Sequence, residues 1–215
     1  MSAWAYLQEL PETVEGFSLK RLMREDGDKF YIYSYESPVL HRSIEVYYHE
    51  ETKEYKLLVI IGLTEFCAIE YISESLAQLE HILRQKFALL IGDLSRFHRE
   101  HINSIVVDKK IMEWNYIPQL PKQLEGFELF ISPAEPVKVI NGSYVVIDYC
   151  DFEIESNFII YYNMFRDEFF GEARIRRIPE VTYAYDSSEL DQLAAKLDEK
   201  LQNTLKDIRQ RALAQ

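Results

Sequence analysis

The chain repeats its own opening segment. Residues 4–19 read WAYLQELPETVEGFSL and residues 114–129 read WNYIPQLPKQLEGFEL, and eight of the sixteen positions are identical. Chance would leave about one match in such a stretch, so we interpret the two segments as copies of one duplicated unit. Both tryptophans of the chain occupy the same place in the motif, as Trp4 and Trp114.

The similarity continues once four extra residues are allowed in the second copy, which changes the offset from 110 to 114. Ile44–Tyr48 then aligns with Phe158–Tyr162. The extra residues fall before Asn141-Gly142, opposite Asp26-Gly27. Both dipeptides are hairpin-turn signals, so we expect the extra residues at a hairpin tip, where a surface loop tolerates them.

The repeat divides the chain into a first copy at 1–102, a connector at 103–113 and a second copy at 114–215. The connector contains neither glycine nor proline. We therefore expect the copies to pack as one pseudo-two-fold body rather than to hang on a flexible linker. Within the connector, the β-branched run Ile105-Val106-Val107 predicts a short strand.

Each copy changes from strand-like to helix-like patterning, which predicts an α+β fold. In the first copy we expect strands at about residues 17–24, 29–36, 43–49 and 55–63, with a short fifth piece at 65–71. In the second copy we expect them at about 127–131, 143–150, 157–163 and 168–178, with a fifth piece at 181–185. The short connections favour one antiparallel sheet of four to five strands in each copy.

One long C-terminal amphipathic helix is predicted to follow each sheet. Apolar residues recur every three or four positions from Leu76 to Phe97 and from Leu190 to Ile208. Ser73 and Ser187 precede these stretches and are the expected N-caps. Two interpretations remain for the first helix.

The first helix either continues for about 28 residues or breaks at Gly92-Asp93. We favour the continuous helix, because the aligned second copy carries Lys206-Asp207 at this place and no helix breaker.

Composition removes several classes of function. With 24 basic and 36 acidic side chains the formal charge is −12, which disfavours a protein that binds nucleic acid through its phosphates. Seven glycines leave little material for a phosphate-binding loop. Neither a nucleophile elbow nor an HExxH motif is present in the sequence. We therefore predict no catalytic residue, no cofactor and no metal.

The sequence also bears on location. No apolar run approaches the roughly 20 residues that span a bilayer, and the opening residues do not resemble a signal peptide. The two cysteines, Cys67 and Cys150, form no CxxC pair and are expected to be buried, reduced thiols. These features predict a cytoplasmic protein that does not associate with membranes.

Two sets of residues are candidates for a site. Trp4, Glu15, Trp114 and Glu125 would line a cleft between the copies if the duplication forms one. Glu15 and Glu125 have a simpler interpretation, as part of a Glu-Gly corner that leads into the first strand of each copy.

Arg174, Arg176 and Arg177 form a basic cluster that would suit an anion. The alternation of strand residues predicts that Arg174 and Arg176 share one sheet face. The other interpretation is a solvated face whose arginines pair with neighbouring glutamates.

Histidines and tyrosines offer weaker signals. His98 and His101 are spaced to share one helix face, but the sequence shows no obvious third ligand, so we expect a solvated helix end. Tyr31, Tyr33 and Tyr35 alternate and are expected on one face, either stacked with bases or a partner protein, or packed in the sheet.

Taken together, these features favour a non-enzymatic protein-interaction or regulatory module that binds a protein partner or a second copy of itself. Two alternatives stay open. In element order only, tandem sheet-plus-helix units resemble the Whirly kind of single-stranded nucleic-acid binder, which would imply an oligonucleotide partner. A small-ligand binder or an enzyme with its site between the copies is the other alternative.

Overall fold

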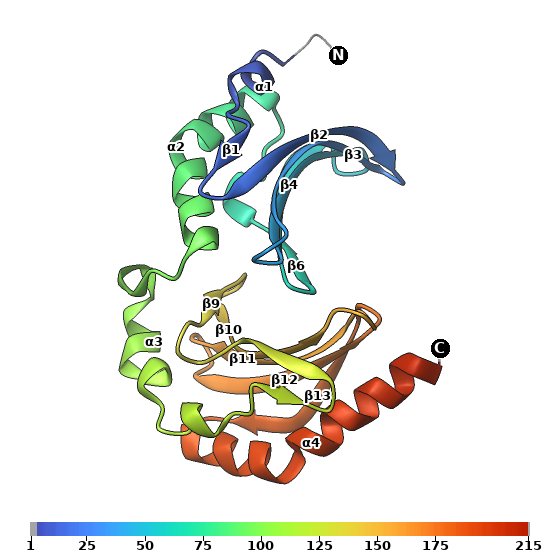
Figure 1. Cartoon of the computed structure of the whole chain (residues 1–215). Coiled ribbons are helices and arrows are strands. Elements are labelled where there is room, and N and C mark those ends of the chain that lie inside the picture. The colour runs from blue at the N-terminus through green and yellow to red at the C-terminus, as the bar shows by residue number, and fades with distance from the viewer. Residues whose placement is uncertain (1–3, 215) are drawn as a thin grey trace. The chain divides into compact units, whose positions relative to one another are not determined.

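The structure is a computed structural model, and it describes residues 4–214. The chain divides into two compact units, unit 1 (Met1–His98) and unit 2 (Arg99–Gln215). Each unit contains an antiparallel sheet followed by a helix (Figure 1). The predicted α+β class with antiparallel sheets is therefore confirmed, but the sheets contain six and seven strands rather than the four to five expected, because short strands such as β1, β7 and β9 add to each sheet.

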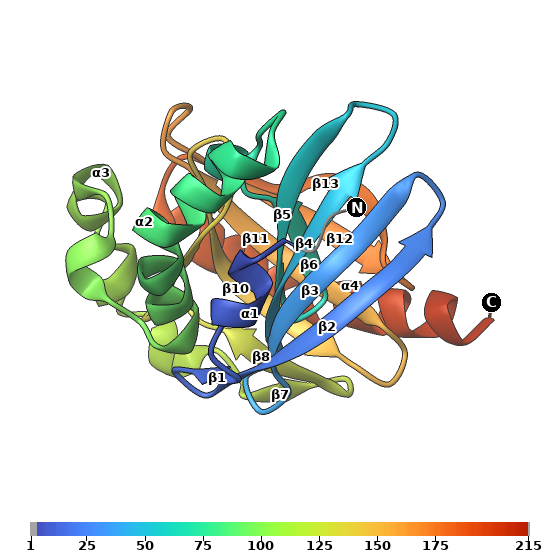
Figure 2. The same cartoon turned by 90° about the horizontal axis from the view of Figure 1, so that it is seen from above.

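Unit 1 contains a six-stranded sheet whose strands pair in chain order. The strands are β1 (Thr13–Val14), β2 (Phe17–Asp26), β3 (Lys29–Ser37), β4 (Arg42–His49), β5 (Glu54–Ile61) and β6 (Thr64–Cys67). Helix α1 (Tyr6–Glu9) precedes the sheet, and the 3-10 turn η1 (Ile69–Tyr71) and helix α2 (Leu76–Ser95) follow it. Figure 2 shows the long strands of unit 1 side by side.

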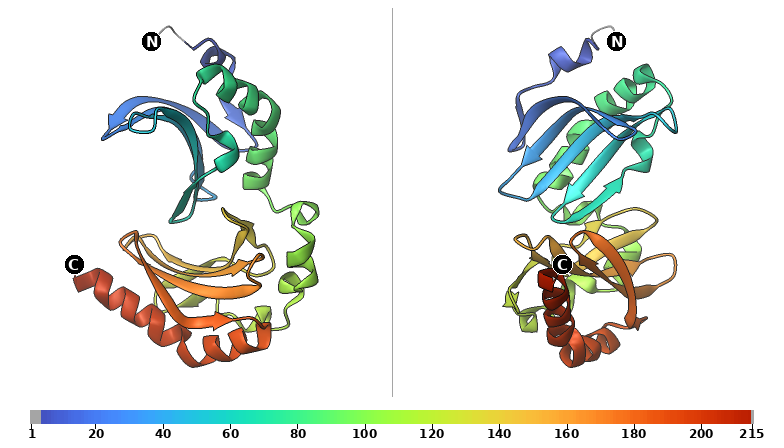
Figure 3. Two further views of the ribbon diagram at one scale, coloured as in Figure 1. Left: turned by 180° about the vertical axis from the view of Figure 1, so that it is seen from behind. Right: turned by 90° about the vertical axis from the view of Figure 1, so that its right-hand side faces the viewer.

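Unit 2 begins with four short helical segments: η2 (Arg99–His101), α3 (Ser104–Asp108), η3 (Ile111–Glu113) and η4 (Ile117–Gln119). Its strands are β7 (Gln123–Leu124), β8 (Phe127–Ile131), β9 (Val137–Lys138), β10 (Ser143–Asp151), β11 (Ser156–Asn163), β12 (Glu168–Ile175) and β13 (Ile178–Ser187). They pair in the order β13-β12-β11-β10-β8-β7, and β9 also pairs with β10. Helix α4 (Leu190–Ala214) runs along one face of this sheet (Figure 3).

Each long helix buries an apolar stripe close to the one that its sequence predicts, except that in α2 Ile91 is buried rather than Leu90 and Phe97 lies beyond the helix. In α2 the buried residues are Leu79, Leu83, Phe87, Ile91 and Leu94, and in α4 they are Leu193, Leu197, Leu201, Leu205, Ile208 and Ala212. Burying one leucine contributes about 1.5–3 kcal/mol, so these stripes are a main source of cohesion between helix and sheet. Within the described residues, no helix is long and apolar enough to cross a membrane.

Both sheets contain a β-bulge, which lies on β3 in unit 1 and on β10 in unit 2. The pairing of β3 with β4 shifts register between Tyr31 and Tyr33, and the pairing of β10 with β11 shifts between Val145 and Ile147. A bulge inserts one extra residue and so changes which side chains share a face. The prediction that Tyr31, Tyr33 and Tyr35 share one face is therefore wrong.

Two helix predictions are also wrong. Helix α2 ends at Ser95, because Ser95 Oγ and Arg96 N both donate to the carbonyl of Gly92, and Arg96 is extended. The favoured continuous helix is thus not formed, and the end lies just beyond Gly92-Asp93. Ser75 rather than Ser73 caps α2, with its Oγ accepting from Gln78 N at 3.2 Å.

Two predictions about connections fail for local reasons. Residues Ile105-Val106-Val107 lie in α3 rather than in a strand, because the side chain of Asn103 accepts from Ile105 N and caps a helical turn. The extra residues of the second copy do not lie at the hairpin tip. They lie between Ile131 of β8 and Val137 of β9, while Asn141-Gly142 forms the turn with positive φ.

Candidate functional site

The two tryptophans of the predicted cleft each pack within their own unit. The Trp4 ring lies 5.1 Å from Tyr6, and its Nε1 donates to Glu80 Oε2 at 2.8 Å. The Trp114 ring lies 5.1 Å from Tyr116 and is buried in the core of unit 2. Within the described residues, Trp114 Nε1 has no hydrogen-bond partner.

The two glutamates of the predicted cleft form tight turns. Glu15-Gly16 joins β1 to β2 and Glu125-Gly126 joins β7 to β8, and all four residues have positive φ. Two-residue hairpins of this kind match the twist of their strands. The structural interpretation of the Glu-Gly corner is confirmed, and Glu125 also accepts from Gln202 Nε2 at 2.8 Å.

The three arginines of the predicted anion site do not converge. Arg174 Nε donates to Glu172 Oε1 at 2.6 Å, and Arg177 Nε donates to Glu155 Oε1 at 3.0 Å. Arg176 Nε instead donates to a carbonyl at the C-terminal end of α4, at 2.9 Å. Strand β12 ends before Arg176, and Arg176 and Arg177 both have positive φ. The prediction that Arg174 and Arg176 share one strand face is wrong.

Sequence reasoning missed a buried polar cluster in unit 2. It lies on the sheet face opposite α4, because its central residue, Asp148, precedes the core residue Tyr149 along β10. Asn157 Nδ2 donates to Asp148 Oδ1 at 2.9 Å. On the same face, Arg174 contacts both Glu172 and Tyr161. We name these five residues (Asp148, Asn157, Tyr161, Glu172 and Arg174) the polar cluster.

Burial controls the charge of this cluster. Asp148 is completely buried, and this burial raises its pKa to about 7, although the hydrogen bond from Asn157 acts in the opposite direction. In the described part of the chain, Asp148 Oδ2 and Asn157 Oδ1 have no hydrogen-bond partner. Nothing in the sequence marks Asp148, because a single aspartate in an apolar strand carries no pattern.

The tyrosines of the first sheet are packed rather than displayed. Tyr33 and Tyr35 are buried, with Tyr33 near Trp4 and Tyr35 near Phe87 of α2. Tyr31 is also buried and packs on Tyr47, with ring centroids 5.5 Å apart. In this structure these rings therefore present no open face on which a base would stack.

Strand β13 presents a different kind of surface, because it is the outer strand of its sheet. It pairs with β12 through Ile175↔Ile178, Arg174↔Pro179 and Glu172↔Val181. The two-residue turn makes Ile175 and Ile178 a hydrogen-bonded pair, and such pairs alternate along antiparallel strands. The backbone groups of Pro179 and Val181 therefore point away from the sheet.

Most of the exposed side chains of β13 are apolar, with Glu180 as a charged exception. Ile178 is 63% exposed, Val181 is 62% exposed and Tyr183 is 79% exposed. Pro179 lies at an outward position, where its missing N–H costs no hydrogen bond in the sheet. β1 and β7 have two residues each and β6 has four, but β1 pairs only with Phe17 and Ser18, so residues 19–26 of β2 form another long edge. That edge is rich in charged side chains, which oppose strand pairing, whereas residues 178–183 of β13 form a largely apolar edge of the kind that pairs with further polypeptide.

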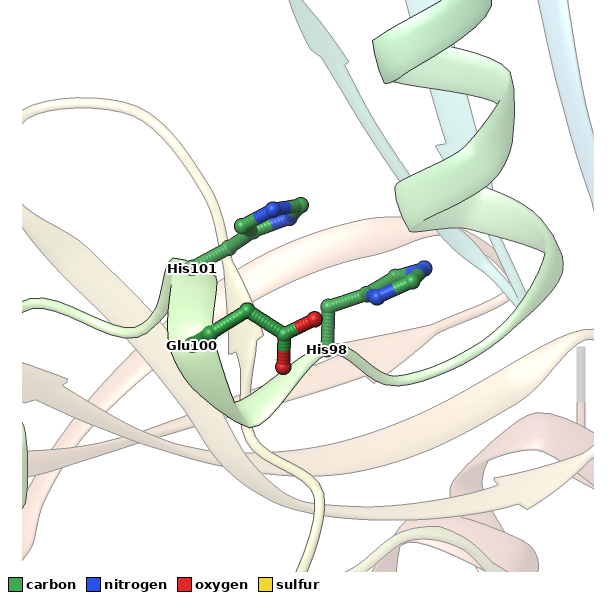
Figure 4. A group of neighbouring side chains, drawn as sticks. All are labelled: His98, Glu100 and His101. Carbon is green, nitrogen blue, oxygen red and sulfur yellow. The ribbon is translucent and has the colours of Figure 1, made fainter.

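A third candidate follows the end of α2. Figure 4 shows His98, Glu100 and His101 projecting from the same side of a short turn. Their potential ligand atoms all lie within 4.8 Å of one another. The sequence indicated the two histidines but not Glu100, whose approach depends on the 3-10 turn that replaces the expected helix.

Comparisons with protein-family models, with curated proteins and with solved structures find no match for this chain. The function must therefore be argued from the residues themselves.

Proposed function

We propose that this chain is a non-enzymatic protein-interaction module built from two duplicated sheet-plus-helix units, and that β13 is its docking strand. The observation that carries the proposal is the long apolar edge of β13. The outward N–H and C=O groups of an edge strand bind extended polypeptide by strand addition. In β13 these are the groups around Pro179 and Val181, since Lys200 and Lys196 donate to the carbonyls of Ala184 and Asp186 in the second half of the strand. The occupant we assign to this edge is β13 of a second copy of the chain.

The duplication is supported by matched geometry. The angle between the rings of Trp4 and Tyr6 is 34°, and between Trp114 and Tyr116 it is 32°. The bulge of β3 and the bulge of β10 fall at positions that differ by the same offset of 114 that aligns the sequences. Insertions at equivalent points of two strands favour a common origin over independent packing solutions.

Self-pairing of β13 is supported by charge. Glu180 pairs with Arg211 at 2.5 Å and Arg177 pairs with Glu155 at 2.9 Å, so the charges beside this edge are neutralised within the unit. Two copies therefore meet through apolar side chains. The net charge of −12 opposes their approach over longer distances, and physiological salt screens that repulsion beyond about 8 Å.

Register also supports a two-fold pairing. An axis through Val181 pairs the outward N–H of each Val181 with the carbonyl of the other copy. The same register sets the Tyr183 ring opposite Pro179 of the second copy. The Pro179 carbonyl then accepts from Tyr183 N of the second copy, while the Tyr183 carbonyl receives no N–H in return because proline has none.

We propose the cytoplasm as the location, and the state of the two cysteines supports a reducing compartment. Neither Cys67 nor Cys150 forms a disulfide, and Cys150 is buried as expected while Cys67 is only half-buried.

The test compares Val181→Lys with a matched control, Val39→Lys. Val39 is 89% exposed and lies away from any sheet edge, in the turn between β3 and β4. Lysine on an edge strand blocks strand pairing, so Val181→Lys should weaken self-association at least about tenfold while Val39→Lys matches the wild type. Sedimentation velocity over a range of concentrations measures the effect.

The dependence of association on salt concentration distinguishes a second copy of the chain from a basic partner protein. Self-pairing of two acidic chains should strengthen as salt rises, whereas binding of a basic partner should weaken. A wild-type chain that stays monomeric at every concentration and salt would overturn the assignment of a second copy. So would a Val181→Lys variant that associates as strongly as the wild type.

A further inference from the structure

We propose that His98, Glu100 and His101 bind a divalent transition-metal ion of the zinc class. Two imidazoles and one carboxylate are a donor set that suits zinc, cobalt and nickel rather than magnesium or calcium. Their ligand atoms lie within 4.8 Å of one another, so small side-chain rotations bring all three onto one ion. This site is independent of the β13 edge.

The backbone explains why these side chains meet. After α2 the chain forms the 3-10 turn η2, which is closed by Ile102 N donating to Arg99 O at 3.2 Å. Residues three apart lie one above the other in a 3-10 turn, which sets His98 beside His101. Since the three ligands lie within four consecutive residues, their spacing depends only on this local turn.

The surroundings of the ligands show what competes with the ion. Arg96 is exposed, and its Nε donates to His98 Nε2 at 3.0 Å. A metal that binds at this nitrogen must displace the Arg96 guanidinium, which the solvent-exposed side chain permits. Arg99 is already engaged by an ion pair with Glu113 and does not need to move.

Exposure determines the remaining coordination. His98 is half-buried, whereas Glu100 and His101 are exposed. With three protein ligands on one side of the ion, water completes the coordination on the solvent side, as in open zinc sites. The acidic excess of the chain also raises the local concentration of cations.

A second group of possible ligands, Asp28, His49 and Glu51, is less suitable and provides a control. His49 Nε2 pairs with Asp28 Oδ2 at 2.8 Å, and His49 Nδ1 lies 2.8 Å from Thr52 Oγ1. Both ring nitrogens are therefore already engaged. An ion there must break one of these contacts, as it must displace Arg96 at His98, but this group offers it only one imidazole.

The experiment is a titration of the full chain with cobalt(II), followed by visible absorption and then by competition with zinc. Substituting a ligand should weaken binding by at least about tenfold, since even the loss of an outer-sphere partner has effects of this size. The variants are His98→Ala, Glu100→Gln and His101→Ala. Matched controls are His81→Ala, on the exposed face of α2, and His49→Ala; both should bind as the wild type does.

Removing Arg96, which competes with the ion for His98, should change the affinity for cobalt in the opposite direction. Arg96→Ala should tighten cobalt binding, because it removes both a donor to His98 and a positive charge near the ion. Circular dichroism verifies that each variant is folded. Equal affinity in the wild type and the His98→Ala and His101→Ala variants would overturn the proposal, and so would loss of binding in His49→Ala alone.

Discussion

In unit 1 the sheet ends with β6, a strand of four residues that leads into a 3-10 turn, whereas in unit 2 it ends with β13, a strand of ten residues that leads directly to α4. The beginnings of the two units are alike. Tyr35 OH donates to Pro11 O at 2.6 Å, and Tyr149 OH donates to Pro121 O at 2.8 Å. The hydrogen bonds near the corner are thus common to both units, and the outer edges differ.

A second difference lies along the helices. Glu80 of α2 accepts from Trp4, but the position that aligns with it in α4 is Ala194, which leaves Trp114 Nε1 without a partner among the described residues. Each tryptophan nevertheless packs on the tyrosine two residues further along, with ring centroids 5.1 Å apart in both units. The packing of each indole ring on its tyrosine is therefore constrained by shape, whereas the hydrogen-bond partner of the indole N–H differs between the two units.

This contrast indicates where the two units acquire separate roles. The sheet of unit 1 ends with a short strand, β6, and its other edge, residues 19–26 of β2, is rich in charged side chains, whereas β13 of unit 2 exposes mostly apolar ones. Apolar edge strands are a liability unless they have a partner. The comparison supports the proposal that unit 2 is the docking unit, and substitutions at equivalent positions test how far the units differ.

The largest expected difference concerns a buried position that carries Ser34 in unit 1 and Asp148 in unit 2. The pKa of Asp148 is raised to about 7 by burial, above its value in the unfolded chain. The folded state then binds the proton more tightly, so the free energy of unfolding falls as the pH rises from about 4 to 7. The decrease is on the order of 4 kcal/mol.

Asp148→Asn should remove this dependence and stabilise the protein at pH 8 relative to the wild type. Urea unfolding at a series of pH values measures the effect. Glu135→Gln, in an exposed loop, is the control and should leave the pH profile unchanged. A wild type and an Asp148→Asn variant with parallel profiles would show that Asp148 is not a buried acid.

The next difference concerns the two glycines of the Glu-Gly corner. Both have positive φ, so alanine at either position costs about 1–2 kcal/mol. A Cβ at Gly16 meets no atom within 4 Å, but a Cβ at Gly126 meets the Arg209 guanidinium that pairs with Asp151. Gly126→Ala should therefore destabilise its unit by about 1 kcal/mol more than Gly16→Ala does.

Urea denaturation followed by tryptophan fluorescence assigns the loss to one unit when Trp114→Phe is added for unit 1 and Trp4→Phe for unit 2, because each unit contains a single tryptophan. Equal losses for the two alanine variants would mean that Arg209 moves away without cost.

The smallest expected effect is one that both units share. Tyr35→Phe and Tyr149→Phe each remove one hydrogen bond to a proline carbonyl, at a cost of about 1 kcal/mol. The same denaturation measurement should give equal losses in the two units. A loss of stability confined to one unit would show that the two hydrogen bonds are not equivalent, and would count against a common origin of the two units.

Much of this fold could be predicted from the sequence, because its strands are rich in aromatic and β-branched residues and its turns carry Asp-Gly, Asn-Gly and Glu-Gly signals. The bulges are not readable. Ile32 and Val146 are ordinary strand residues, and the extra residue is detectable only from the register of the neighbouring strand. The end of α2 depends on side-chain bonds of Ser95 that compete with the helix, and sequence periodicity does not reveal them.

Less of the candidate sites could be predicted from the sequence. Arg176 and Arg177 adopt positive φ although neither is glycine or asparagine, so the end of β12 carries no sequence signal. The polar cluster and the ligand set around Glu100 arise from tertiary packing and from a local 3-10 turn. The apolar residues of β13 were visible in the sequence, but their exposure depends on β13 being the outer strand.

The central claim concerns the outward backbone of β13, and amide hydrogen exchange at Val181 tests it most directly. Thr182, whose amide points toward β12 and Gly171, is the internal reference and should be protected at every concentration. The account predicts that exchange at Val181 slows as the protein concentration rises, because the second copy supplies an acceptor. Rapid exchange at Val181 that does not change with concentration would contradict it.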